Sequence, residues 1–224
     1  MKIFGYWHST TLPPFILNSI ETTKKNNPYI DYDIYDYTRA IQFIKDNFDG
    51  EVLDAFNSFI PESYKSDLLR FCLLYKFGGL YMDLKLILNP IDTSFFDSEY
   101  HFAKGTKRRC LKWKPLETSF LYFKKPGLPG FKKVIDRIVL NSKLKDKTCH
   151  DLYVTGPLLL GEHFQDYQPT LKCIFYKIPI ISHNYSYNGY NLVSNDLNPY
   201  YNKSHQSYWK LWKSKKSIYN IISN

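Results

Sequence analysis

Four charged residues between Ser66 and Lys85 have types and spacings that suit chemistry. Asp67 and Arg70 are at positions i and i+3, which lie on one face of a helix. Asp83 and Lys85 are at positions i and i+2, which lie on one face of a strand. Carboxylates hold hard divalent cations, and an ammonium group can neutralise phosphate charge. The Asp83 and Lys85 side chains therefore face something polar, which is either solvent or a ligand.

Proline and glycine mark both ends of the segment that carries Asp67 and Arg70. Pro61 precedes a run, 62–77, that contains no further proline or glycine and has apolar residues at helical spacing. A proline in the first turn and the Gly78-Gly79 pair at the end match the preferences of helix termini. The sequence therefore predicts a helix over residues 62–78.

An alternating pattern predicts a strand over Leu80 to Leu88, directly after this helix. Leucine and methionine occupy every second position, so one face is fully apolar. The other face carries Tyr81, Asp83 and Lys85. It is these three side chains that must meet solvent or a ligand.

The expected dimensions of the helix and the strand bring Asp83 close to the helical charges. A helix rises about 1.5 Å per residue, which puts Arg70 about 12 Å and Asp67 about 16 Å before Gly78. A strand rises about 3.3 Å per residue, which puts Asp83 about 13 Å beyond Gly79. If the strand doubles back along the helix, two carboxylates and a guanidinium converge.

The run SDLLRF…LYKFGGLYMDLK resembles the DXD-containing sugar transferases of glycosyltransferase family 32. That family includes fungal initiating mannosyltransferases and is distantly similar to the catalytic domains of large clostridial toxins. The match covers Ser66 to Asp83, but Lys85 stands where the family has its second aspartate. The resemblance implies an α/β fold, with a single GT-A-like (Rossmann-like) nucleotide-sugar transferase domain and a mostly parallel central sheet.

The resemblance also implies an activity: transfer of a hexose from a UDP- or GDP-sugar donor to a glycan or protein acceptor, with retention of configuration. It assigns donor contacts to the matched residues, with the Asp67 carboxylate on sugar hydroxyls and the Arg70 guanidinium on sugar or phosphate. Without the motif, this pair would read as an intrahelical ion pair. The residues implied in donor binding within the motif are Asp67, Arg70, Gly79, Tyr81 and Asp83, with Asp83 and Lys85 as the catalytic pair.

Lys85 leaves three hypotheses open. A family member uses both aspartates to hold Mn²⁺ or Mg²⁺ against the departing diphosphate. Lys85 could replace part of that metal's role, which would make the cation dispensable. Alternatively, Asp83 could hold the metal together with His205. The third hypothesis is a catalytically impaired relative that binds sugar nucleotides or glycans.

Aromatic residues near both ends of the chain loosely match family positions. Trp7 falls at the tryptophan that is implied to stack on the nucleotide base, although it could equally be a core residue. Near the C-terminus, His205 and Trp209 are implied to reach the metal and the leaving diphosphate. Residues 155–157, Thr-Gly-Pro, resemble a family element on the acceptor side.

The rest of the chain reads as alternating strands and helices. We expect one domain over residues 1–224, in which 193–224 form an irregular tail that closes the site. The strands are expected at 2–7, 29–35, 117–123 and 174–181, with little periodicity afterwards. The helices are expected at 12–25, 37–57, 131–140 and 158–164.

The net charge of +9, from 30 basic and 21 acidic residues, indicates which classes of binding partner are compatible with the chain. It permits peripheral contact with an anionic membrane or an acidic glycan. The basic segment 104–114 is either a solvated loop or a rim that attracts a diphosphate or an acidic acceptor. A nucleic-acid-binding protein is the remote alternative, and we expect no nucleic-acid partner. The absence of a signal-peptide core and of a long apolar run predicts a cytoplasmic location.

Overall fold

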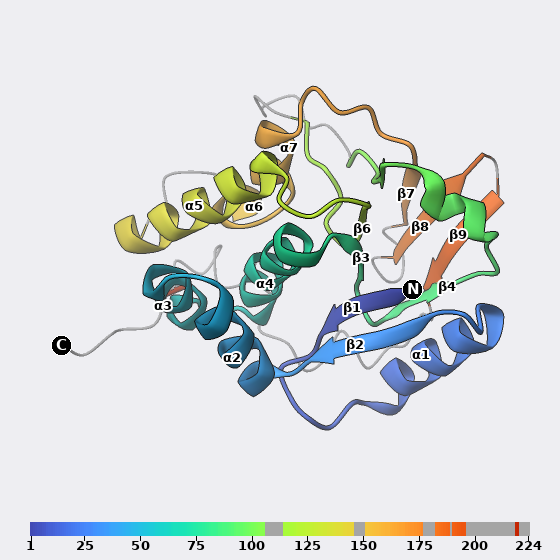
Figure 1. The fold of residues 1–224 in the computed structure, drawn as a ribbon, viewed down its shortest axis with the longest axis horizontal. Coiled ribbons are helices and arrows are strands. Elements are labelled where there is room, and N and C mark those ends of the chain that lie inside the picture. Colours follow the sequence, from blue (N-terminus) through green and yellow to red (C-terminus); the bar gives the residue numbers. More distant parts are fainter. Residues whose placement is uncertain (106–113, 146–150, 177–181, 189, 196–217, 220–224) are drawn as a thin grey trace.

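The computed structural model describes residues 1–105, 114–145, 151–176, 182–188, 190–195 and 218–219. Two sheets are visible in Figure 1. The central sheet has the order β2-β1-β3-β6-β5 and the second sheet the order β4-β9-β8-β7. Their strands are β1 (Lys2–Tyr6), β2 (Asp31–Tyr35), β3 (Gly79–Met82), β4 (Leu86–Leu88), β5 (Tyr100–His101), β6 (Phe120–Phe123), β7 (Lys172–Tyr176), β8 (Ser182–Tyr187) and β9 (Tyr190–Asn195).

The central sheet confirms the predicted α/β class with a mostly parallel sheet. Strand β1 pairs in parallel with both β2 and β3. Strand β6 is antiparallel to β3 and to β5, so it alone runs against the other four. The first three parallel strands therefore end at one edge of the sheet, where parallel α/β folds place their ligands.

Helices cover one face of the central sheet, and the second sheet covers the other. In Figure 1, α2 to α7 lie on the first side, while α1, β4 and β7 to β9 lie on the second. Within the described residues, no helix is both long and apolar enough to cross a membrane. The helices are α1 (Pro14–Asn26), α2 (Tyr37–Asn47), α3 (Gly50–Ser58), α4 (Glu62–Phe77), α5 (Pro129–Leu144), α6 (Asp151–Val154) and α7 (Pro157–His163), with a 3₁₀ turn, η1 (Thr93–Asp97).

Alternation along the strands explains the two layers. Phe4 and Tyr6 of β1 pack into the cluster formed by the helices. Ile3 of the same strand, together with Leu80 and Met82 of β3, packs into the cluster shared with the second sheet. Successive strand residues point to opposite faces, so short apolar strands can fill two cores at once.

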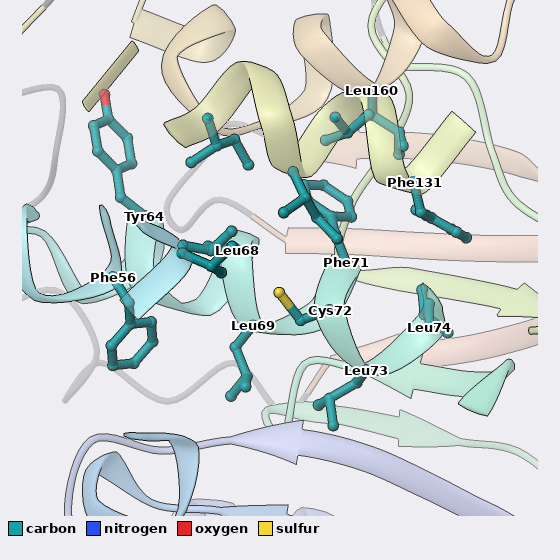
Figure 2. Close-up of a cluster of buried hydrophobic side chains, with 14 of the residues drawn as sticks. Phe56, Tyr64, Leu68, Leu69, Phe71, Cys72, Leu73, Leu74, Phe131 and Leu160 are labelled. Atoms are coloured by element: carbon teal, nitrogen blue, oxygen red, sulfur yellow. The ribbon is translucent and has the colours of Figure 1, made fainter. Parts of the chain in front are cut away.

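Helix α4 lies between the sheet and the other helices and is buried on nearly all sides (Figure 2). Pro61 occupies its N-cap position, and Gly78 ends it with a positive φ of 66°. A Cβ atom on Gly78 would lie 2.9 Å from the backbone oxygen of Phe123, so only glycine fits this turn. The predicted helix boundaries are thus confirmed, with Gly78 as the cap.

The strand predicted over residues 80–88 was wrong as a single element. It is split into β3 and β4, which belong to different sheets. Residues 83–85 form a turn between them, closed by a hydrogen bond of 2.9 Å from the Leu86 amide to the Asp83 carbonyl. Leu84 is buried, which preserves the alternating pattern, but it packs on α1 beside Phe15, Ile16 and Ile20. A Cβ on Gly5 would lie 2.2 Å from a Leu84 methyl carbon, so this glycine makes room for the turn.

Three other expectations also differ from the structure. The helix expected at 37–57 is divided into α2 and α3, because the Asp49 side chain accepts a hydrogen bond from the Val52 amide and begins a new helix. The strand expected at 174–181 is β7, which begins at Lys172. Among the described residues that follow, β8 and β9 pair with each other, and β9 also pairs with β4. The irregular tail predicted at 193–224 therefore overlaps the end of β9.

Candidate functional site

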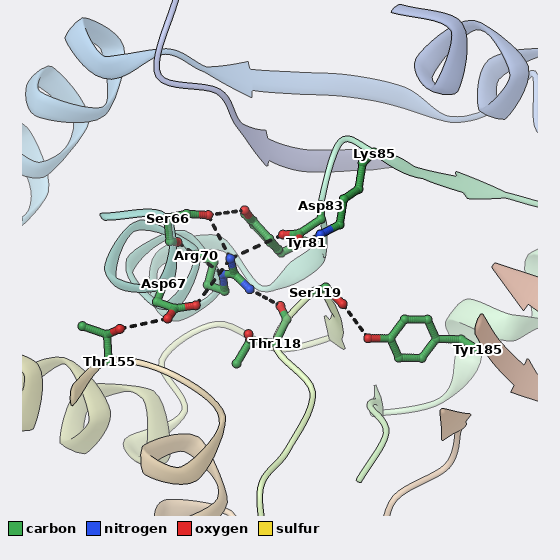
Figure 3. Close-up of polar contacts among 10 residues, drawn as sticks. All are labelled: Ser66, Asp67, Arg70, Tyr81, Asp83, Lys85, Thr118, Ser119, Thr155 and Tyr185. Carbon is green, nitrogen blue, oxygen red and sulfur yellow. Dashed lines mark hydrogen bonds and ion pairs between the residues drawn. The ribbon is translucent and has the colours of Figure 1, made fainter. Parts of the chain in front are cut away.

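The candidate site lies at the edge of the central sheet where β1, β2 and β3 end (Figure 3). Asp83 directly follows β3, and its amide donates to the Ser119 carbonyl at 2.9 Å. Asp67 and Arg70 reach the same place from α4, which runs back along β3 as the sequence predicted. The Ser119 hydroxyl is in turn 2.6 Å from the Tyr185 hydroxyl, which ties the second sheet to this edge.

Asp67, Arg70, Asp83 and Lys85 form what we call the four-charge cluster. One Arg70 nitrogen, Nη2, lies 3.4 Å from Asp67 Oδ1 and 3.4 Å from Asp83 Oδ1. Lys85 Nζ lies 3.6 Å from the other Asp83 oxygen, Oδ2. The Asp83 carboxylate therefore stands between two cations. The convergence predicted from the helix and strand dimensions is confirmed, with the addition of Lys85.

Arg70 is 4% exposed, and its hydrogen bonds go to the protein itself. Nη1 donates to the Thr118 carbonyl at 2.5 Å, Nη2 to the Ser66 hydroxyl at 2.8 Å and Nε to the Ser66 carbonyl at 3.2 Å. Burial alone would lower the pKa of Arg70, but Tyr81 and the two carboxylates raise it above its ordinary value. The guanidinium thus remains charged and fixes the positions of both aspartates.

Asp67 is 8% exposed and is held by a residue far away in the chain. The Thr155 hydroxyl donates to Asp67 Oδ2 at 2.9 Å. A Cβ on Gly156 would lie 3.1 Å from the same oxygen, so the Thr-Gly pair packs closely against this carboxylate. Burial raises the pKa of Asp67 above its ordinary value, against the opposing effects of Arg70 and Thr155.

Tyr81 lines the cluster from β3. Arg70 lies over its ring, 4.6 Å from the centroid, and its hydroxyl is 2.9 Å from the Ser66 hydroxyl. Burial raises the pKa of Tyr81, although Arg70 acts in the opposite direction. Tyr81 and Ser66 therefore help to hold the guanidinium in place.

The other predicted site residues lie at different places. Trp7 follows β1 at the same sheet edge, is half-buried and packs edge-on against Phe15, 6.3 Å between ring centroids. Gly79 lies at the opposite end of β3 from Asp83, where its φ of 88° serves the turn after α4. Outside the described residues are His205, Trp209 and most of the basic segment 104–114.

Sequence reasoning missed Glu117 and Thr118. Thr118 supplies a carbonyl to Arg70, and the sequence gives no signal for such a backbone role. Glu117 is 6% exposed, and its carboxyl lies over Gly105, where a Cβ would approach Oε1 to 2.3 Å. Burial and the nearby Asp83 raise the pKa of Glu117 to about 8, opposed by Lys85. An acidic residue at the start of the strand expected at 117–123 was the available signal.

The raised pKa of Glu117 predicts a pH-dependent stability. The folded chain keeps this proton up to about pH 8, whereas the unfolded chain releases it near pH 4.5, so the free energy of unfolding falls as pH rises between these values. Each pKa unit corresponds to about 1.4 kcal/mol, so the total fall is a few kcal/mol. Glu117→Gln is neutral throughout and should flatten the profile in urea unfolding at pH 5 to 8. Glu99→Gln, at an exposed site, is the control, and equal slopes for all three proteins would contradict the prediction.

Comparisons with known proteins agree with this geometry. Residues 14–99 match the family model described as the glycosyltransferase sugar-binding region containing the DXD motif. The match covers less than half of the chain. The matched residues hold all four members of the four-charge cluster. No curated protein sequence shows significant similarity to the chain.

A solved structure supports the fold of this chain. The structure named PaToxG Glycosyltransferase is similar with a TM-score of 0.53 and 16% sequence identity, covering 74% of this chain and 68% of that one. At this identity the likeness concerns the fold, and it confirms the predicted GT-A-like architecture. Assignment to glycosyltransferase family 32 remains a prediction.

DXD glycosyltransferases generally use a divalent cation, and the described residues fit one poorly. Their carboxylates, histidines and cysteines form no group of three that could hold a metal ion. Asp83 already faces Arg70 and Lys85, and position 85 offers an ammonium group where the motif has a carboxylate. Hard divalent cations need several oxygen ligands. The described residues therefore supply no metal-binding group to the site.

Proposed function

We propose that the chain transfers a hexose from a UDP- or GDP-sugar to a glycan or protein acceptor. The observation that carries this proposal is the four-charge cluster at the carboxyl edge of the sheet, inside the region that matches the glycosyltransferase model. A pair of positioned carboxylates can bind sugar hydroxyls, and a neighbouring ammonium group can bind phosphate oxygens. The sugar and the diphosphate of a sugar nucleotide would thus each meet complementary groups in the cluster.

The residues divide into contact and positioning roles. Asp67 and Asp83 are proposed to accept hydrogen bonds from the donor sugar, and Lys85 to bind the diphosphate. Arg70 is better suited to positioning, because its hydrogen bonds go to Ser66 and Thr118. Trp7 has a half-buried ring at the same sheet edge, which suits stacking on the nucleotide base.

The proposed reaction breaks the bond between the anomeric carbon and the phosphate oxygen, and the electron pair leaves with the nucleoside diphosphate. The acceptor hydroxyl oxygen forms the new bond on the same face of the sugar, and its proton passes to the departing phosphate. No separate nucleophile is assigned, so retention would follow from attack on the donor face. The protein lowers the barrier by placing fixed charges where charge develops.

Titration calorimetry with a panel of UDP- and GDP-sugars tests the proposal, together with a donor-hydrolysis assay. We expect one sugar nucleotide to bind with a Kd in the micromolar range and to be slowly hydrolysed. Proton NMR of the first-formed free sugar would report retention. Absence of binding by every sugar nucleotide would overturn the proposed function.

Lys85 favours one alternative function, a relative that binds sugar nucleotides or glycans without turnover. The motivation is that the ammonium group stands where the motif has a second carboxylate. Binding without hydrolysis or transfer to any acceptor would favour this alternative. Measurable turnover would exclude it.

A further inference from the structure

We propose that the Lys85 ammonium group takes the place of the divalent cation, so that this chain binds a nucleoside diphosphate without metal. The inference rests on the proposed function, because it concerns how the same site neutralises the donor diphosphate. Three observations carry it: the position of Lys85 Nζ, the formal charge of the cluster and the packing that fixes the turn.

The position of Lys85 Nζ is that of a cation bound to Asp83. It lies 3.6 Å from Oδ2, while Arg70 Nη2 lies 3.4 Å from Oδ1. The Lys85 side chain is 18% exposed, so the ammonium group is partly shielded yet accessible from the sheet edge. An ammonium group carries three donors, so one can face Asp83 while others reach phosphate oxygens.

The formal charge of the four-charge cluster gives the second argument. Two carboxylates and two cations make it neutral. With aspartate at position 85, three carboxylates and one cation would leave a charge of −2, which one divalent cation neutralises. The lysine therefore balances the site by itself, and a divalent cation placed beside it would meet a like charge.

Packing on both sides of Lys85 fixes the turn that presents it. Leu84 is buried beside Phe15, Ile16 and Ile20, and the Leu86 amide closes the turn on the Asp83 carbonyl at 2.9 Å. The backbone of Lys85 is thereby fixed between Leu84, which is buried, and Leu86, which is hydrogen-bonded to Asp83. Such preorganisation is what a group that replaces a bound cation requires.

Calorimetric titration with UDP and with GDP, in EDTA and in an excess of Mn²⁺, tests the inference. We expect the better-bound nucleotide to show equal affinity within about twofold in both buffers. Lys85→Asp should lose about tenfold or more in EDTA and recover in Mn²⁺, since one order of magnitude corresponds to one modest interaction. Lys85→Met should lose affinity in both buffers, because it restores neither cation nor carboxylate.

Electron paramagnetic resonance of Mn²⁺ alone gives a readout independent of nucleotide. We expect Lys85→Asp to bind Mn²⁺ more tightly than the wild type. Lys24→Asp is the matched control, because Lys24 pairs with Asp31 at 3.0 Å on the surface and its replacement makes the same charge change away from the site. It should behave as the wild type does.

The outcomes separate the two proposals. If the wild type binds UDP or GDP only when Mn²⁺ is present, the inference is overturned and the proposed function stands. If Lys85→Asp gains no response to Mn²⁺ in either measurement, the inference is also overturned. If the wild type binds neither nucleotide in either buffer, the proposed function fails and the inference fails with it.

Discussion

Asp83→Asn is expected to lower the rate of glycosyl transfer by about 100- to 1,000-fold, the range for losing one preorganised electrostatic contact. The Asp83 carboxylate faces Arg70 at 3.4 Å and Lys85 at 3.6 Å. Asparagine keeps the shape but removes the charge that holds these cations in place. Arg70 keeps its ion pair with Asp67 and its hydrogen bonds to Ser66 and Thr118, so the free energy of unfolding should change little.

Initial rates at saturating donor, combined with urea unfolding, separate this effect from loss of folding. Asp33→Asn is the matched control, because Asp33 is also partly buried and paired with an arginine, Arg39, at 2.5 Å. The control should retain its rate within a few-fold. A rate for Asp83→Asn equal to that of the control would contradict a role for this carboxylate in the reaction.

Arg70→Met is expected to lower the free energy of unfolding by about 3–5 kcal/mol, the cost of removing one partner of a buried ion pair. The change leaves the carboxylate of Asp67, which is 8% exposed, without its cation, and leaves the Thr118 carbonyl without its donor. Urea unfolding at pH 7 measures the loss. Arg39→Met, which removes a more exposed cation from Asp33, should cost only about 0–1 kcal/mol.

A second substitution tests the cause of that loss. Adding Asp67→Asn to Arg70→Met removes the uncompensated charge and should recover part of the lost stability. If the double variant is as unstable as the sum of the two single variants, the buried charge is not the cause. Retention of full stability by Arg70→Met alone would contradict the prediction outright.

The sequence was sufficient where local rules decide the structure. Pro61 and Gly78 mark the ends of α4, and helix and strand dimensions bring Asp83 to the height of Arg70. The direction of the first three strands also follows from their order in the chain. These features depend on neighbouring residues or on one connection between elements.

The sequence was insufficient where contacts between distant segments determine the structure. Alternation alone could not distinguish one strand from two, because Leu84 is buried in a different cluster from Met82. Thr118 reaches the site across a long stretch of chain through a backbone carbonyl, which marks no motif. Thr155 belongs to the Thr-Gly-Pro element expected on the acceptor side, but the sequence did not indicate that its hydroxyl contacts Asp67. Strand β9 pairs with β4, about a hundred residues earlier in the chain, and a scan for apolar periodicity does not detect such a pairing.

The turn at residues 83–85 also matters mechanically, because it is the shortest of the chain segments that join the central sheet to the second sheet. Asp83 directly follows the last residue of β3, and Lys85 directly precedes the first residue of β4. If one sheet slid over the other, the distance between the Asp83 and Lys85 side chains would therefore change. A displacement of β9 would therefore reach Lys85 through the pairing of β9 with β4.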